Sequence, residues 1–98
     1  MFETESAEIR KLMQDRNVRL IFTTHARKIR MPERNITDSD VRTVLRSCTV
    51  TDKRFSHPGE VLSAEGKDLD GRNLRICVRI NPPCTLIVVT TIDLDKRS

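Results

Sequence analysis

The side chains best suited to chemistry lie in one short segment, residues 24–36 of this 98-residue chain. His25, one of the chain's two histidines, is followed there by Arg27, Lys28, Arg30 and Arg34. An imidazole can move a proton near neutral pH, and Lys and Arg side chains bind phosphate groups. This combination indicates catalysis or binding on a nucleic acid backbone, and it fits both an RNA-cutting enzyme and a basic binding surface.

His25 is the candidate for proton transfer. It is expected close to the start of a helix, where the positive end of the helix dipole favours the neutral ring and keeps a base available. We therefore predict a catalytic role as general base or acid. In the alternative interpretation, the ring packs against the sheet and hydrogen-bonds to a backbone carbonyl. The other histidine, His57 in Ser56-His57-Pro58-Gly59, is interpreted as a turn residue.

A second pair of basic residues, Arg75 and Arg79, lies on a predicted strand. Their spacing puts both on one face, and we predict that they are catalytic because they clamp the scissile phosphate as charge builds up on its oxygens. Further basic residues are predicted to bind the substrate: Lys28, Arg30, Arg34 and Lys67. The alternative is ordinary solvated faces, with Arg75 neutralised by Glu65. The catalytic prediction requires His25 and the arginine pair to meet in one cleft.

The cysteines give no sign of a metal or cofactor site. Cys48, Cys77 and Cys84 form no Cys-x-x-Cys pair, and no His-x-His pair occurs. We expect no metal and no cofactor. Cys77 is interpreted as a buried, inert thiol, and the alternative is a nucleophile activated by Arg75 and Arg79. An odd number of cysteines without an N-terminal signal segment predicts a cytoplasmic protein in a reducing compartment.

The amino-acid composition limits the kinds of partner that the chain is expected to bind. Eighteen Lys and Arg against fourteen Asp and Glu give a formal charge of +4, so polyanions are plausible partners, although such an excess is also common in proteins that bind none. The three aromatic residues, all Phe, are too few for a surface that stacks on bases, so phosphate contacts should dominate any RNA binding. No apolar run approaches the roughly 18 residues of a membrane helix, so no membrane partner is expected.

The hydrophobic pattern changes at the middle of the chain. Residues 1–47 carry helical spacing and residues 48–93 carry strand alternation, which predicts one α+β domain over residues 1–98. We expect two to three N-terminal helices packed on a mainly antiparallel sheet of three to five strands. Residues 1–17 are expected to form an N-terminal helical extension, whose helix starts at Thr4 or Ser6 and runs to about residue 16.

Two further helices carry start and stop signals. One is expected to start at a Thr23 or Thr24 cap and to be limited by Pro32. The next should start at a capping box made by Thr37 and Asp40. Its buried stripe is predicted to consist of Val41, Val44 and Leu45.

The strands follow from runs of apolar residues and from alternation. Residues 19–23 and 86–89 are predicted strands, the second of them central because it is apolar on both faces. A three-residue loop at 69–71, with Gly71 left-handed, joins two amphipathic strands and keeps their faces consistent. The resulting register pairs Gly66 with Leu74, Ala64 with Ile76, Leu62 with Val78, and Glu65 with Arg75.

The signature His-Ala…Arg-Met…Arg-x-Ile, from His25 to Ile36, resembles a small bacterial domain of unknown function. That domain is similar to the RelE/BrnT group of toxin-antitoxin ribonucleases. The resemblance spans about residues 22–92 and includes the motif Gly66-x-Asp68-x-Asp70-Gly71-Arg72. His25 and Arg30 are five residues apart rather than the expected four, which on an ideal α-helix rotates Arg30 by about a quarter turn.

The resemblance implies a RelE/BrnT-like fold and metal-independent endoribonuclease activity. A 2′-hydroxyl would attack the adjacent phosphorus and leave a cyclic phosphate, and an acidic antitoxin-like protein would hold the toxin in check. The alternative is a non-catalytic binding module that uses the same basic face for nucleic acid or for an acidic protein partner. These expectations of activity and partner depend on fold analogy.

Overall fold

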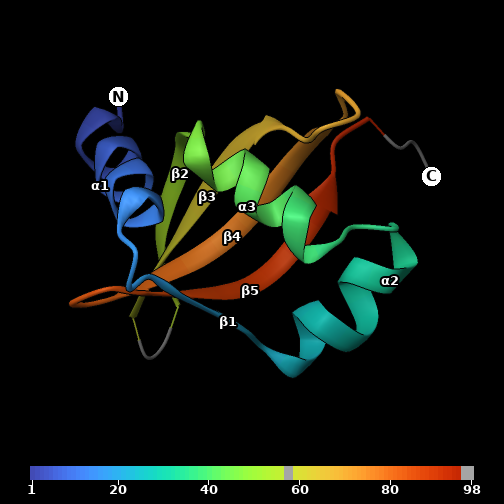
Figure 1. The fold of residues 1–98 in the computed structure, drawn as a ribbon, viewed down its shortest axis with the longest axis horizontal. Coiled ribbons are helices and arrows are strands. Elements are labelled where there is room, and N and C mark those ends of the chain that lie inside the picture. Colours follow the sequence, from blue (N-terminus) through green and yellow to red (C-terminus); the bar gives the residue numbers. More distant parts are fainter. Residues whose placement is uncertain (57–58, 96–98) are drawn as a thin grey trace.

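The chain folds into a mixed five-stranded sheet with helices packed on one face (Figure 1). This computed structural model describes residues 1–56 and 59–95. The helical elements are α1 (Glu3–Gln14), the π-helical turn η1 (Ala26–Arg30), α2 (Met31–Glu33) and α3 (Asp38–Arg46). The strands are β1 (Arg19–Phe22), β2 (Thr49–Ser56), β3 (Gly59–Lys67), β4 (Asn73–Asn81) and β5 (Thr85–Asp93). The predicted α+β class, with helices before a mainly antiparallel sheet, is confirmed.

The sheet has the strand order β1-β5-β4-β3-β2. β2 to β5 form an antiparallel meander, whereas β1 runs parallel to β5 and places that strand inside the sheet. The central position predicted for residues 86–89 is therefore correct. β1 and β2 are the two edge strands, so the first and second strands of the chain lie on opposite sides of the molecule.

The loop between β3 and β4 has the predicted geometry. Gly71 has a φ of 84°, in the left-handed region that glycine tolerates, and Asp68 and Arg72 pair across the loop through a backbone hydrogen bond of 3.0 Å. Gly66 pairs with Leu74 and Glu65 pairs with Arg75, as the alternation required. Leu62, Ala64, Leu74, Ile76 and Val78 consequently lie on the face that joins the buried core.

The helix α1 begins differently from the prediction. It starts at Glu3 and ends at Gln14, and no side chain caps its start, so neither Thr4 nor Ser6 is the N-cap. Ser6 is buried instead: its hydroxyl donates to the Phe2 carbonyl at 2.8 Å and accepts from the Val50 amide at 2.7 Å. This hydroxyl therefore satisfies a backbone donor of the edge strand β2 that no neighbouring strand reaches.

The helix α3 is the central element of the helical layer, and it packs on α1, β3 and β4. Its start is the predicted capping box, in which Thr37 accepts from the Asp40 amide at 3.2 Å and the Asp40 carboxylate accepts from the Thr37 amide at 2.9 Å. The expected stripe of Val41, Val44 and Leu45 is fully buried.

Two further expectations concern membrane-spanning helices and His57. Among the described residues, no helix is both long enough and apolar enough to cross a membrane. His57, interpreted as a turn residue, lies outside the described residues.

Candidate functional site

The segment that carries His25 forms a π-type turn, which the sequence did not indicate. In η1 the Met31 amide donates to the Ala26 carbonyl, five residues earlier, and the helix then continues through Pro32 to Glu33. The helix therefore ends one residue after Pro32, and the predicted limit is confirmed to within one residue. A proline ring disrupts a regular α-helix because it lacks an N–H and crowds the carbonyl four residues before it, and a widened turn just ahead of the proline accommodates that disruption. Isolated π-turns occur frequently at functional sites.

The widened turn brings His25 and Arg30 together. Arg30 Nε donates to His25 Nε2 over 3.2 Å, and the His25 side chain is exposed. The quarter-turn rotation expected from an ideal α-helix does not occur, because a π-turn aligns residues five apart. The imidazole therefore accepts this hydrogen bond through Nε2. Its hydrogen-bond partner is a guanidinium rather than the backbone carbonyl of the alternative interpretation.

The other basic side chains of the segment differ in how tightly they are held. Arg27 pairs with Asp38 at 2.9 Å, and its guanidinium carbon lies 4.3 Å from the centre of the Phe22 ring. Arg27 therefore anchors η1 to α3 and β1. Lys28 is exposed, and Arg34 lies 3.6 Å from Glu33. Lys28, Arg30 and Arg34 remain the side chains of this segment that are positioned to meet an external anion.

Arg72 fixes the loop after α2, a role that sequence reasoning missed. Its Nη atoms donate to the carbonyls of Arg34 and Asn35 at 2.8 and 3.1 Å, and its Nε donates to Asp68 at 2.7 Å. Asp40, from the capping box, lies 3.4 Å away. One guanidinium thus joins the segment 34–35, the start of α3 and the β3–β4 loop. Arg72 stands in the Gly66-to-Arg72 motif, which was the only signal in the sequence.

The Asp68 carboxylate that faces Arg72 has no exposed side-chain surface. Burial acts to raise its pKa, but hydrogen bonds from the Arg72 side chain and from the amides of Arg72 and Asp70 outweigh burial, so the pKa of Asp68 lies below its ordinary value. The pair is therefore ionised and fully hydrogen-bonded near neutral pH.

Arg75 and Arg79 lie on β4, on the sheet face opposite the helices. Arg75 donates twice to one Glu65 oxygen, at 2.9 and 2.8 Å, and Thr51 donates to the same oxygen at 2.8 Å. Arg79 donates to the Ser56 carbonyl at 3.2 Å. Desolvation acts to raise the pKa of Glu65, but these hydrogen bonds from Arg75 and Thr51 outweigh it and leave the pKa lowered.

The predicted site residues therefore fall into two groups. His25, Lys28, Arg30 and Arg34 lie on or next to η1 and α2, whereas the other predicted residues lie on β3 and β4: Lys67, Arg75 and Arg79. η1 packs against β5, and β5 lies between β1 and β4 in the sheet. The hydrogen bonds of Arg75 and Arg79 run toward β3 and β2, on the side of β4 away from β5. A joint catalytic role for His25 with these two arginines stays a prediction.

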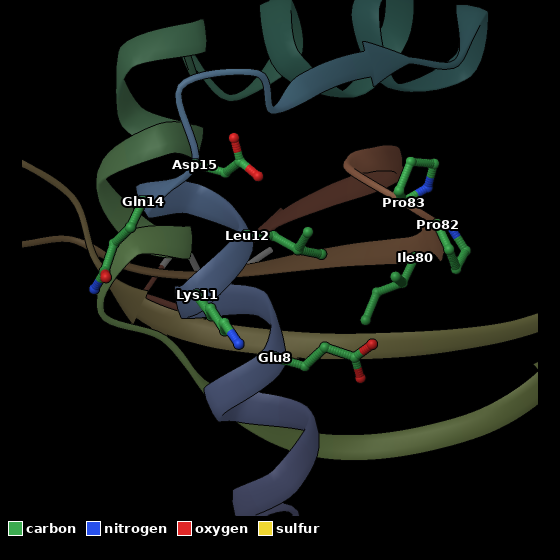
Figure 2. A pocket seen from close by; sticks show the side chains of 8 residues that line it. All are labelled: Glu8, Lys11, Leu12, Gln14, Asp15, Ile80, Pro82 and Pro83. Atoms are coloured by element: carbon green, nitrogen blue, oxygen red, sulfur yellow. The ribbon is translucent and has the colours of Figure 1, made fainter.

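Two of the surface hollows outside the η1 segment exceed 500 Å³. One, of about 540 Å³, is lined only by strand residues of the face opposite the helices, including Glu65, Arg75 and Cys77. The other, of about 520 Å³, lies between α1 and the β4–β5 turn (Figure 2). Leu12 and Ile80 give the second hollow apolar walls, and none of the predicted site residues lines it.

The cysteines are separate from one another and from His25. Cys48 and Cys77 are buried, Cys84 is half-buried, and all three are free thiols. Burial raises the pKa of the Cys48 thiol to about 11, against a smaller opposing effect of Arg10. Within residues 1–56 and 59–95, no three side chains of His, Cys, Asp or Glu are arranged to hold a metal ion.

Comparison with protein families identifies the domain. The family described as a domain of unknown function, DUF4258, matches residues 22–93, from the end of β1 to the end of β5. The chain belongs to the DUF4258 family. The resemblance to a domain of unknown function is thus confirmed, while the similarity to RelE/BrnT toxins stays a prediction. Every predicted site residue lies within the DUF4258 segment, and α1 lies before it. No match to a curated protein or to a solved structure was found.

Proposed function

We propose that this DUF4258 domain binds RNA through the η1–α2 segment and cleaves it without a metal ion, in the manner of RelE/BrnT-like toxins. The observation that carries the proposal is the exposed pair of His25 and Arg30, 3.2 Å apart, in a segment rich in basic residues. An imidazole that can accept a proton then lies directly beside a guanidinium that can hold a phosphate. These are the two groups that cleavage by a neighbouring 2′-hydroxyl requires.

The hydrogen bond between the two side chains suggests how they would act. In the unbound protein, Arg30 occupies the Nε2 lone pair of His25. A phosphate oxygen is a stronger acceptor for a guanidinium than a neutral ring is, so a bound phosphate would draw Arg30 away and release that lone pair. His25 would then take the proton of the 2′-hydroxyl as its oxygen bonds to phosphorus. The bond from phosphorus to the 5′-oxygen breaks, that oxygen takes up a proton from water, and His25 gives its proton back to the solvent.

The remaining basic residues would act through charge. Lys28 and Arg34 would bind flanking phosphates next to Arg30, with Lys67 as a further contact at the end of β3. Arg75 and Arg79 are proposed to stabilise the charge on the phosphate oxygens. For this, the RNA must also reach the sheet face opposite the helices, and Arg75 must exchange Glu65 for the RNA. An acidic antitoxin-like protein that covers the basic segment would block the same groups.

The test is incubation of the purified protein with RNA in EDTA between pH 6 and 8, with detection of cyclic phosphate ends. Substitution His25→Ala or Arg79→Ala should each lower cleavage by at least roughly tenfold, if each group stabilises the transition state by more than about 1.4 kcal/mol. Intact RNA in the presence of folded protein would defeat the enzymatic proposal.

A non-catalytic binding module is the second candidate, and one observation favours it. Arg75 donates two hydrogen bonds to one oxygen of Glu65, and Arg27 pairs with Asp38, so two of the arginines already have partners within the domain. Binding measured against salt distinguishes the partners. Attachment to several RNA phosphates should weaken steeply as salt rises, whereas a protein partner that buries apolar surface should respond much less.

A further inference from the structure

The outer edge of the sheet offers a second surface, at the strand farthest from β1. All residues of β2 except Val50 are exposed. The start of β2 is covered by α1 through the Ser6–Val50 hydrogen bond. No hydrogen bond from any other described segment reaches the outer backbone edge of residues 52–55. An open edge of this kind pairs readily with another strand.

The side chains on this edge alternate in a particular way. Asp52 and Arg54 pair with Ser63 and Val61 of β3, so both lie on the sheet face opposite the helices. Lys53 points to the helical face, where it lies 2.9 Å from Glu5 and 3.6 Å from Glu60. Asp52 and Arg54 have no ion pair within the described part of the chain. One face of the open edge thus carries two opposite charges, two residues apart.

We propose that β2 pairs antiparallel with β2 of a second copy, centred on Lys53, to give a continuous two-fold sheet. Antiparallel pairing about a two-fold axis places residues of the same face opposite one another. In the register centred on Lys53, Asp52 of each copy faces Arg54 of the other, which gives two cross-strand pairs of opposite charge. Registers centred on Asp52 or on Arg54 place like charges opposite each other on that face.

Two features of the edge bear on this register. Charged residues on an edge strand usually prevent it from pairing with the same strand of another molecule. Here, Asp52 and Arg54 carry opposite charges two residues apart, so two antiparallel copies of β2 place opposite charges against each other. The two Lys53 side chains meet at the axis, and each is already paired with Glu5 and Glu60 of its own chain. The β2 edge lies across the sheet from β1, so the dimer leaves the His25 segment open and does not depend on the proposed function.

The test is sedimentation of the full chain and of two charge reversals, Asp52→Arg and Arg54→Asp. The wild type should dimerise, and each variant alone should show a dissociation constant raised at least roughly tenfold, since its copies then oppose like charges. A mixture of the two variants should associate again, because each then supplies the charge that the other lacks. Neither residue has a partner within the described chain, so both variants should fold, and circular dichroism checks this.

An engineered disulfide tests the proposed β2–β2 register independently of the charge reversals. Lys53→Cys places thiols at the axis, where opposed Cα atoms are about 4.5–5.5 Å apart, within disulfide reach. It should give an oxidised dimer that Phe55→Cys and the wild type do not give under the same conditions. The proposal is overturned if the wild type is monomeric up to about 1 mM. It is also overturned if mixing the reversals restores no association, or if Lys53→Cys forms no linked dimer.

Discussion

The Nε atom of Arg30 lies 3.2 Å from the Nε2 atom of His25, so two residues five apart in the sequence form one exposed unit. The π-turn η1 creates this relationship, since its hydrogen bond joins residues five apart. If the unit binds and cleaves RNA, both of its members should be needed, and they should be needed for different reasons.

Arg30→Ala should lower cleavage by at least roughly tenfold and weaken RNA binding, because the phosphate loses its guanidinium. Arg30→Lys keeps the charge without the planar fork, so it should retain more binding than cleavage. Arg46→Ala on α3 is the matched control, since it removes one exposed arginine from another helix. Cleavage by Arg30→Ala at the wild-type rate would contradict this role.

Arg72→Ala should lower the free energy of unfolding by about 2–4 kcal/mol, because it leaves the buried Asp68 carboxylate without its charge partner. The carbonyls of Arg34 and Asn35 lose their donor in the same substitution. Urea denaturation measures the loss. Arg72→Lys keeps the charge but cannot make all of these contacts, so its free energy of unfolding should lie between those of the wild type and the alanine variant. Equal free energies of unfolding for the wild type and Arg72→Ala would contradict this stabilising role of Arg72.

Acid should destabilise the protein partly through Asp68. Its pKa is lowered in the folded state, so its contribution to stability is complete above the ordinary Asp pKa of about 4 and is lost as pH falls through the lower folded value. Asp68→Asn should therefore be less stable at pH 7 and should lose less stability between pH 5 and 2. Thermal unfolding across that range tests the prediction, and parallel curves for the two proteins would count against it.

Gly66 is packed too closely to accept a side chain. A Cβ there would lie 3.3 Å from Val44 Cγ1 and 3.4 Å from the Val44 carbonyl oxygen, where α3 crosses β3. Gly66→Ala should cost about 1–3 kcal/mol of stability. At Gly59 an added Cβ would meet nothing within 4 Å, so Gly59→Ala is the control and should stay within about 0.5 kcal/mol of the wild type.

The thiols should react in a fixed order. Cys84 is half-buried, whereas Cys77 is 3% exposed and Cys48 is fully buried, with a pKa raised to about 11. An alkylating reagent at pH 8 should label Cys84 first, because reaction requires an accessible thiolate. Mass spectrometry of native and unfolded protein reads the order, and early labelling of Cys48 would show that α1 and α3 do not pack as described.

The parts of the fold that were predictable from sequence are those with local signals. The alternation around Gly71 defined the β3–β4 register, and the Thr37–Asp40 pair marked the start of α3. The parallel pairing of β1 with β5 was not predicted, because residues 19–22 contain nothing that selects a partner strand more than 60 residues away. The capping role assigned to Ser6 failed because the requirement that its hydroxyl meets, the free Val50 amide, arises only after folding.

The candidate site was predictable in composition but not in geometry. The sequence shows His25 among basic residues, yet a π-turn leaves no periodic pattern, so the pairing with Arg30 was not expected. Arg72 was overlooked because its partners come from three separate segments. Such contacts depend on the tertiary structure, and no fixed spacing along the sequence marks the residues that make them.

The bond between Ser6 and Val50 has a practical consequence for anyone who expresses only the segment that defines the family. A fragment of residues 22–93 would lack α1, and with it the hydroxyl that covers the start of β2 and the buried side chains of Ile9 and Met13. Such a fragment should aggregate, since it exposes an apolar surface beside an uncovered strand. Poor growth of cells that make the fragment would then reflect insoluble protein rather than toxicity.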